Sequence, residues 1–201
     1  MSFTLDLLAA FTLFAFVSSI TPGPNNTMLL ASGVNFGFRR SVPHALGVSI
    51  GFMLMVLAVG LGLGAVFKAV PMAYTVLRWT GAAYLLYLAY KIATSGPMSA
   101  HGADGERRPM SFLAAAAFQW VNPKAWVMAI GAITTYTPAD GYFANVCVIA
   151  VLFAVVNLPS VCVWVGCGTA LRSVLQDRRW LMLFNGLMAI LLVASLYPML
   201  R

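Results

Sequence analysis

The sequence predicts an all-α integral membrane protein whose six membrane-spanning helices form two inverted three-helix repeats. The first observation is composition: 61% of the 201 residues are hydrophobic and 8% are charged, whereas soluble domains carry about 25% charged residues. The second is spacing, because six apolar stretches have roughly the 20 residues that a transmembrane helix needs. The third is that proline motifs interrupt the first and fourth stretches at corresponding places.

The six predicted spans fall into two groups of three. A connection at about 95–110, rich in Gly, Pro, Ser and charge, is typical of a linker. We treat residues 1–201 as one transmembrane domain, with repeats at about 5–94 and 111–200. Because three is odd, the second repeat enters the membrane in the opposite orientation, as in many transporters. The spans are predicted at about 5–31, 44–67, 72–94, 111–135, 142–169 and 180–200.

The distribution of Lys and Arg predicts the orientation of these spans. Positive charge gathers in cytoplasmic connections, and here it gathers in the first, third and fifth connections. We therefore expect those three connections in the cytoplasm and both termini outside. The net charge of +7 is explained by topology, so no nucleic-acid partner is expected. The charges on the predicted cytoplasmic side are Arg39, Arg40, Lys91, Arg107, Arg108, Arg172, Arg178 and Arg179.

The two proline motifs predict a binding site near the middle of the membrane. Proline removes a backbone donor and glycine lets the chain turn, and unwound backbone at membrane depth is tolerated only where protein or water satisfies it. Two such breaks in opposed repeats would face each other and offer helix-end dipoles and free carbonyls. The motif residues are Thr21, Pro22, Gly23, Pro24, Asn25 and Asn26 in the first span, and Gln119, Asn122, Pro123 and Lys124 in the fourth.

An amino-acid zwitterion suits such a site, since it needs donors for its carboxylate and acceptors for its ammonium group. The Asn and Gln amides offer both functions. Lys124 is an ionisable residue inside a span, which indicates function, and we expect it to be the counter-charge of the carboxylate. The alternatives are kinks that only shape packing and a Lys124 side chain that reaches the outer interface. Asn157, followed by Pro159, is expected to break the fifth span and to line the same cavity.

Several other residues have weaker assignments. His44, at the predicted cytoplasmic start of the second span, and Asp6, near the outer face, are candidates for carrying a coupling proton. The three cysteines show no zinc-type spacing, and no metal or cofactor is expected. The pairs Gly47 and Gly51, and Gly60 and Gly64, would allow close helix packing within the chain or in a homodimer.

The motif segments resemble those of the LysE/RhtB family of amino-acid exporters. The resemblance rests on TPGPNNTMLLASGVNFGFRRSVPHALGVSIG at residues 21–51, WTGAAYLLYLAYKI at 79–92 and FQWVNPKAW at 118–126. It is closest to the branch that exports cysteine and O-acetylserine-like metabolites. The resemblance implies export of small amino acids or their derivatives across the cytoplasmic membrane, driven by the proton gradient, with both proline motifs at the substrate site.

Other functions fit the sequence less well. A thiol–disulfide relay needs a thiolate pair within reach, and the first and fourth spans contain no cysteine. An exporter of metal ions would need His, Asp or Cys clusters inside the spans. A non-transporting membrane scaffold or sensor, or an exporter of another small solute, stays open as an alternative.

Overall fold

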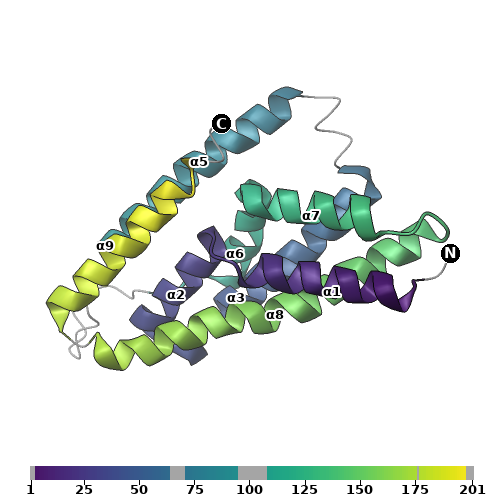
Figure 1. Cartoon of the computed structure of the whole chain (residues 1–201). Helices are drawn as coiled ribbons and strands as arrows, with labels where there is room; N and C mark the ends of the chain where they lie inside the picture. Colours follow the sequence, from purple (N-terminus) through teal and green to yellow (C-terminus); the bar gives the residue numbers. More distant parts are fainter. Residues whose placement is uncertain (1–2, 64–70, 95–107, 176, 198–201) are drawn as a thin grey trace.

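The computed structural model describes residues 3–63, 71–94, 108–175 and 177–197, and its regular elements are helices (Figure 1). Three parts of the predicted elements lie outside the described residues. They are the end of the second span at 64–67, the linker at 95–107 with Arg107, and the end of the sixth span at 198–200.

The first predicted span is interrupted where the motif predicts. Helix α1 covers Leu5–Ile20 and α2 covers Pro24–Phe36, and their axes differ by 56°. Gly23 is the N-cap of α2, and Pro24 occupies its first turn, where a missing N–H costs nothing because the first amides of a helix have no intrahelical acceptor. The predicted interruption of this helical segment is confirmed, although α2 continues beyond the predicted end at residue 31.

The second span starts earlier than predicted. Gly37 has a φ of +79°, a left-handed conformation that glycine adopts without steric cost, and α3 begins directly after it at Phe38. Helix α3 covers Phe38–Ala58 and continues as a π-helical turn, η1, at Val59–Leu63. Arg39, predicted in a connection, therefore lies in the first turn of α3, and His44, predicted at the helix start, lies in the second turn. The sequence did not reveal this because a single glycine suffices as the connection.

The remaining elements follow in the predicted order. Helix α5 covers Pro71–Ala93. The segment predicted as the fourth span consists of α6 at Phe112–Phe118, a 3₁₀ turn η2 at Gln119–Val121 and α7 at Pro123–Tyr136. Helix α8 covers Tyr142–Val174 and α9 covers Arg178–Ala194. The predicted interruption of the fourth span is confirmed, with Asn122 between η2 and α7.

The predicted break in the fifth span is wrong. Helix α8 runs without interruption through Asn157 and Pro159 for 33 residues. The proline ring lies on an exposed face of the helix, so it removes one hydrogen-bond donor without displacing a neighbouring helix. The Ser160 hydroxyl donates to the Val156 carbonyl at 2.8 Å, which adds a local bond beside the missing one.

Two segments of the described chain, or three if a bent pair is counted as one, are long and apolar enough to cross a membrane. The two segments are Phe38–Leu63 and Tyr142–Val174, and the bent pair is α1–α2. Helix α9 has 17 residues, and Phe112–Val121 is a shorter apolar helix.

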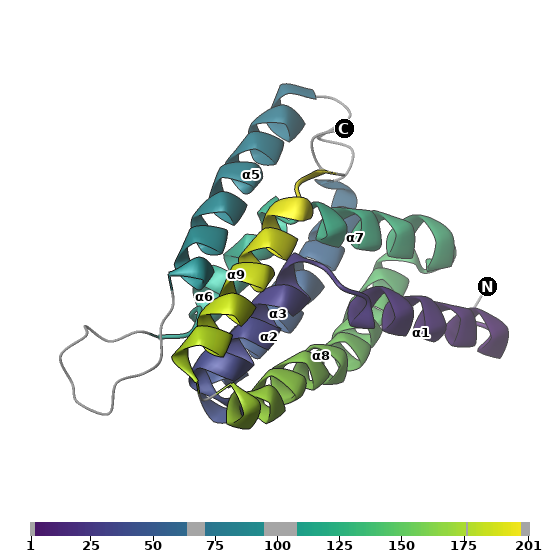
Figure 2. The same cartoon turned by 60° about the vertical axis from the view of Figure 1, so that its left-hand side comes forward.

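Corresponding elements of the two halves run in opposite directions along the molecule. The α2–α3 junction and the α8–α9 turn lie at one end, whereas the start of α1 and the α7–α8 turn lie at the other (Figures 1 and 2). Helices α1 and α2 therefore run away from the end toward which α6 and α7 run. In each half, part of the broken first segment packs on the second long helix of the other half: α2 packs on α8, and α6 packs on α3. The third helices of the two halves, α5 and α9, pack on each other.

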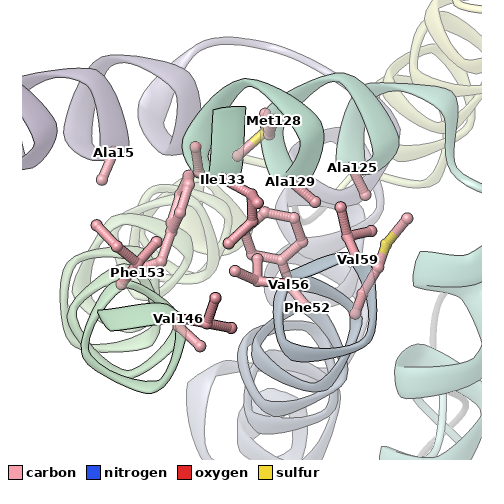
Figure 3. Close-up of a cluster of buried hydrophobic side chains, with 14 of the residues drawn as sticks. Ala15, Phe52, Val56, Val59, Ala125, Met128, Ala129, Ile133, Val146 and Phe153 are labelled. Carbon is pink, nitrogen blue, oxygen red and sulfur yellow. The ribbon is translucent and has the colours of Figure 1, made fainter. Parts of the chain in front are cut away.

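The largest apolar core closes the end of the molecule at which α1 begins. Figure 3 shows side chains of α3, α7 and α8 converging, among them Phe52, Phe153 and Ile133. Phe153 packs edge-on against Phe52 and Phe11, with ring centroids 4.7 and 5.5 Å apart. Such edge-to-face pairs add to the stabilisation from burial alone. We call the linked rings of Phe11, Phe14, Phe52, Tyr136 and Phe153 the aromatic plug.

Glycines bring α2 and α6 into close contact with the long helices. A Cβ atom at Gly47 would overlap the Phe112 carbonyl of α6, and one at Gly168 of α8 would overlap the Leu30 carbonyl of α2. The prediction of close packing at Gly47 and Gly51 is confirmed, and the neighbour is α6 of the same chain. Gly64 lies outside the described residues.

Candidate functional site

The two chain breaks meet in space although about 100 residues separate them. Asn25 of the first break forms a reciprocal amide pair with Gln119 of the second, with N···O distances of 2.8 and 3.2 Å. The Lys124 ammonium, in the first turn of α7, reaches the end of α1. The prediction that both motifs face one another therefore agrees with the structure.

Every carbonyl from Val17 to Gly23, around the first break, has a hydrogen-bond donor. Backbone amides serve Val17 and Gly23, and the Thr21 hydroxyl serves Ser18 at 3.1 Å. The Asn26 amide donates to Ser19 and Thr21, at 2.8 Å each. The carbonyls that the sequence analysis expected to be free for a ligand are thus bonded within the protein, as buried polar groups generally are. The last two donors are the indole Nε1 of Trp164, 3.1 Å from the Ile20 carbonyl, and Lys124, 3.3 Å from that of Pro22.

Lys124 joins the two breaks through three contacts. Its Nζ donates to the Thr21 carbonyl at 2.7 Å and to the Thr21 hydroxyl at 2.9 Å, besides its contact with Pro22. A cation at a helix C-terminus is also favoured by the helix dipole. Gly23 makes room for this lysine, since a Cβ there would lie 2.9 Å from the Lys124 Cδ.

The two helix N-termini at the breaks differ in their capping. The Asn122 side chain accepts from the Lys124 backbone N–H at 3.1 Å and so caps α7, with Pro123 next in the chain. Gly23 contributes no side-chain cap to α2. The first N–H groups of a helix lack intrahelical acceptors, and together they form a site that favours an anion. The uncapped start of α2 lies beside the Lys124 ammonium, so both favour a carboxylate at the same place.

Asn157 connects the breaks to the long helices. Its Nδ2 donates to the Ser19 hydroxyl at 3.0 Å, and its Oδ1 accepts from the Ser49 hydroxyl at 2.7 Å. All three side chains are buried. Asn157 thus lies at the site as predicted, although the helix break predicted beside it is absent.

A small cavity lies between these groups. Its lining includes Gly23, Asn25, Asn26, Gln119, Asn122, Lys124 and Asn157, together with Ser18, Ser19 and Phe52. With a volume of about 20 Å³, it has room for little more than one water molecule. A ligand of amino-acid size therefore requires the lining groups to move apart. Ser18, Ser19 and Ser49 were missed by the sequence analysis because isolated serines are common in apolar helices.

A second, larger cavity lies at the other end of α2, and we call it the vestibule. It measures about 660 Å³ and lies between α2, α3, α5 and the start of α6. Asn35, His44, Tyr87, Lys91 and Ala114 are among its lining residues. His44 is therefore separate from the central cavity. Asp6 is exposed in the first turn of α1, at the end of the molecule closed by the aromatic plug.

The arrangement of the central cavity suits a zwitterion. The start of α2 and Lys124 favour a carboxylate, and the amide oxygens of Asn25, Gln119 and Asn157 are acceptors that an ammonium group could use. No carboxylate side chain lines the part of this cavity that the structure describes. The local groups can thus bind and orient a small polar molecule between two opposed helix breaks.

The comparisons with known proteins identify the class of protein. The family model "LysE type translocator" matches residues 16–196, and the chain belongs to this family. Curated relatives named "Cysteine/O-acetylserine efflux protein" come from Escherichia coli K12, E. coli O6:H1 (strain CFT073) and Shigella sonnei (strain Ss046). Each is 38% identical over 157 residues, which cover 77% of this chain and 78% of the relative. No solved structure gives a significant match.

The family membership has two consequences. The chain is a multi-pass membrane transport protein and not an enzyme. The matched segment contains both chain breaks and every lining residue of the central cavity. The resemblance inferred from the motifs is therefore confirmed.

Proposed function

We propose that this protein exports a small neutral amino acid or derivative, of the cysteine and O-acetylserine class, from the cytoplasm across the inner membrane. The observation that carries this proposal is the meeting of the two breaks, with Lys124 of one bonded to Thr21 and Pro22 of the other. The names of the relatives support the class of solute.

In this proposal the substrate replaces contacts that the protein makes with itself. Its carboxylate takes a place near the start of α2 and the Lys124 ammonium, and its ammonium group takes the amide oxygens that Asn25 and Gln119 now share. The ammonium group donates to both amide oxygens, and the substrate carboxylate can accept from the amide N–H groups that lose their partners, which limits the cost of the exchange. Thr21, Pro22, Gly23, Pro24, Asn26, Asn122 and Pro123 hold the two helix ends in place around the substrate.

The proposed architecture is a single domain of six spans in two inverted repeats. The spans are α1–α2, α3–η1, α5, α6–α7, α8 and α9, and the opposite directions of corresponding elements support this assignment (Figure 2). We place the end with the α2–α3 junction in the cytoplasm and both termini outside, because Arg39, Arg40 and Arg172 lie at that end. A homodimer stays a prediction.

Coupling to the proton gradient is part of the proposal. Asp6 and His44 lie outside the central cavity, toward opposite ends of the molecule, so coupling through either would act at an end of the proposed path. An uncoupler that leaves export unchanged would remove this element and leave the assignment of the solute intact.

An efflux experiment tests the proposed function. Cells that lack their own exporters are loaded with a panel of amino acids, the protein is expressed, and each solute is followed in the medium with and without an uncoupler. We expect selective, uncoupler-sensitive loss of cysteine or O-acetylserine. No efflux of any panel member, with the protein present in the membrane, would refute the proposal.

A further inference from the structure

The central cavity has an apolar side as well as a polar one. The apolar side is lined by Val48 and Phe52 of α3, Ala125 and Met128 of α7, and Val161 of α8. The groups assigned above to the carboxylate and the ammonium of the solute bind parts that every amino acid has. The choice between one amino acid and another is therefore made where the side chain of the solute lies.

The geometry of an amino acid leaves the apolar side of the cavity for its side chain. The carboxylate, the ammonium group and the side chain leave the α-carbon in different directions, and the first two are assigned to the start of α2, Lys124 and the Asn25–Gln119 pair. An uncharged side chain gains free energy by contact with apolar groups. A cationic side chain would lose its hydration there and meet no carboxylate among the described lining residues.

Phe52 is the apolar lining residue whose position is fixed most firmly. Its ring lies between α3, α7 and α8 (Figure 3) and packs edge-on against Phe153, with centroids 4.7 Å apart. Phe153 packs in turn against Phe11, at 5.5 Å. The backbone is also held, because a Cβ at the adjacent Gly51 would overlap Ala116 of α6. In a closely packed interior, neither the ring nor its helix can withdraw from a solute.

The other apolar lining residues restrict a solute less. Met128 is unbranched and adapts its shape to its neighbours, and Val48, Ala125 and Val161 are shorter than phenylalanine. Phe52 belongs both to the cavity lining and to the aromatic plug. Its ring is therefore the boundary between the space for the solute and the packed rings behind it.

We propose that Phe52 is a specificity-determining residue, whose ring contacts the side chain of the solute and limits the size of side chain that the central cavity accepts. This inference rests on the proposed function and deepens it, since it says which amino acids the same site selects. A short uncharged side chain, such as that of cysteine or O-acetylserine, fits beside the ring. An aromatic side chain does not.

Competition between solutes in vesicles tests this role. The full-length protein is purified and reconstituted in lipid vesicles loaded with O-acetylserine, and exchange with radiolabelled O-acetylserine is measured. The readout is the half-inhibitory concentration of phenylalanine divided by that of unlabelled O-acetylserine, a ratio that does not depend on the amount of active protein. A misfit of one methylene group changes discrimination about 10–200-fold, so we expect a parental ratio of at least about ten.

Phe52→Ala removes one phenyl group, and phenylalanine carries one, so the ring of the solute can occupy the vacated space. We expect the ratio to fall about tenfold or more. The matched control is Phe11→Ala, which removes the same ring from the aromatic plug at a position outside the described lining of the central cavity. The control should keep the parental ratio.

Phe52→Leu provides a milder variant, because it keeps an apolar side chain in the core and is expected to insert even if Phe52→Ala does not. Its ratio should fall about threefold or more. Parental ratios in the Phe52 variants, an equal fall in Phe11→Ala, or equal competition by the two solutes in the parent would overturn the inference. Parent vesicles that exchange no amino acid would refute the proposed function instead.

Discussion

The Lys124 side chain bonds one break to the other. We expect its replacement to lower the export rate while the protein still folds and inserts into the membrane. In Lys124→Met the side chain keeps an unbranched apolar stem, one atom shorter, but loses the charge and the hydrogen bonds to Thr21 and Pro22. A charge-assisted hydrogen bond to the substrate carboxylate contributes roughly 1.5–3 kcal/mol, so we expect the loss of this counter-charge to lower export by about 10- to 100-fold.

The measurement is the initial export rate, normalised to the amount of protein in the membrane. Lys124→Arg keeps the charge and should preserve the membrane level while it restores only part of the rate, because the planar guanidinium does not fit three closely spaced acceptors. Export by Lys124→Met at the parental rate would show that the lysine is a spacer only.

Gly23 gives an independent residue-level prediction. A Cβ at this position would lie 2.9 Å from the Lys124 Cδ, so Gly23→Ala should displace the lysine and lower export about tenfold or more without changing charge. The matched control is Gly186→Ala in α9, where an added Cβ meets nothing within 4 Å. Equal export rates in the two variants would contradict the role assigned to Gly23.

At the level of elements, the local breaks could be predicted from sequence and their partners could not. Proline and glycine act on the adjacent backbone, so the interruptions at residues 21–23 and near Asn122 are visible in the motifs. The bond from Lys124 to Thr21 joins residues 103 positions apart, and no local pattern encodes it. Pro159 marks the limit of the rule, because α8 continues through it where its ring lies on an exposed face.

The contact between α2 and α8 supplies the prediction at this scale. Gly168→Ala places a Cβ against the Leu30 carbonyl, and overpacking of this kind costs about 1–3 kcal/mol. We expect a lower midpoint of thermal unfolding in detergent. Gly166→Ala, two residues away, points into open space and should leave the midpoint unchanged or slightly raised. A similar midpoint in both variants would mean that α2 and α8 separate easily.

The whole molecule is asymmetric between its two ends. The vestibule lies open at the end with the α2–α3 junction, whereas the aromatic plug fills the opposite end between α1, α3, α7 and α8 (Figure 3). Corresponding helices of inverted repeats exchange such roles during transport. With the orientation proposed above, the structure corresponds to a state that faces the cytoplasm, and we predict that export requires α1 and α7 to move apart at the plug.

A reversible cross-link across the plug tests this requirement. The rings of Phe14 on α1 and Tyr136 at the end of α7 have centroids 5.3 Å apart. Cysteines at both positions, in a variant in which Cys147, Cys162 and Cys167 are replaced by serine, can be joined by a short thiol cross-linker that a reductant cleaves. We expect export to stop on cross-linking and to return on reduction, because the plug can no longer open. Each single-cysteine variant, treated with the same reagent, controls for simple modification. Unchanged export with complete cross-linking would show that the solute leaves by another route, and the assignment of α1 and α7 as the outer gate would be wrong.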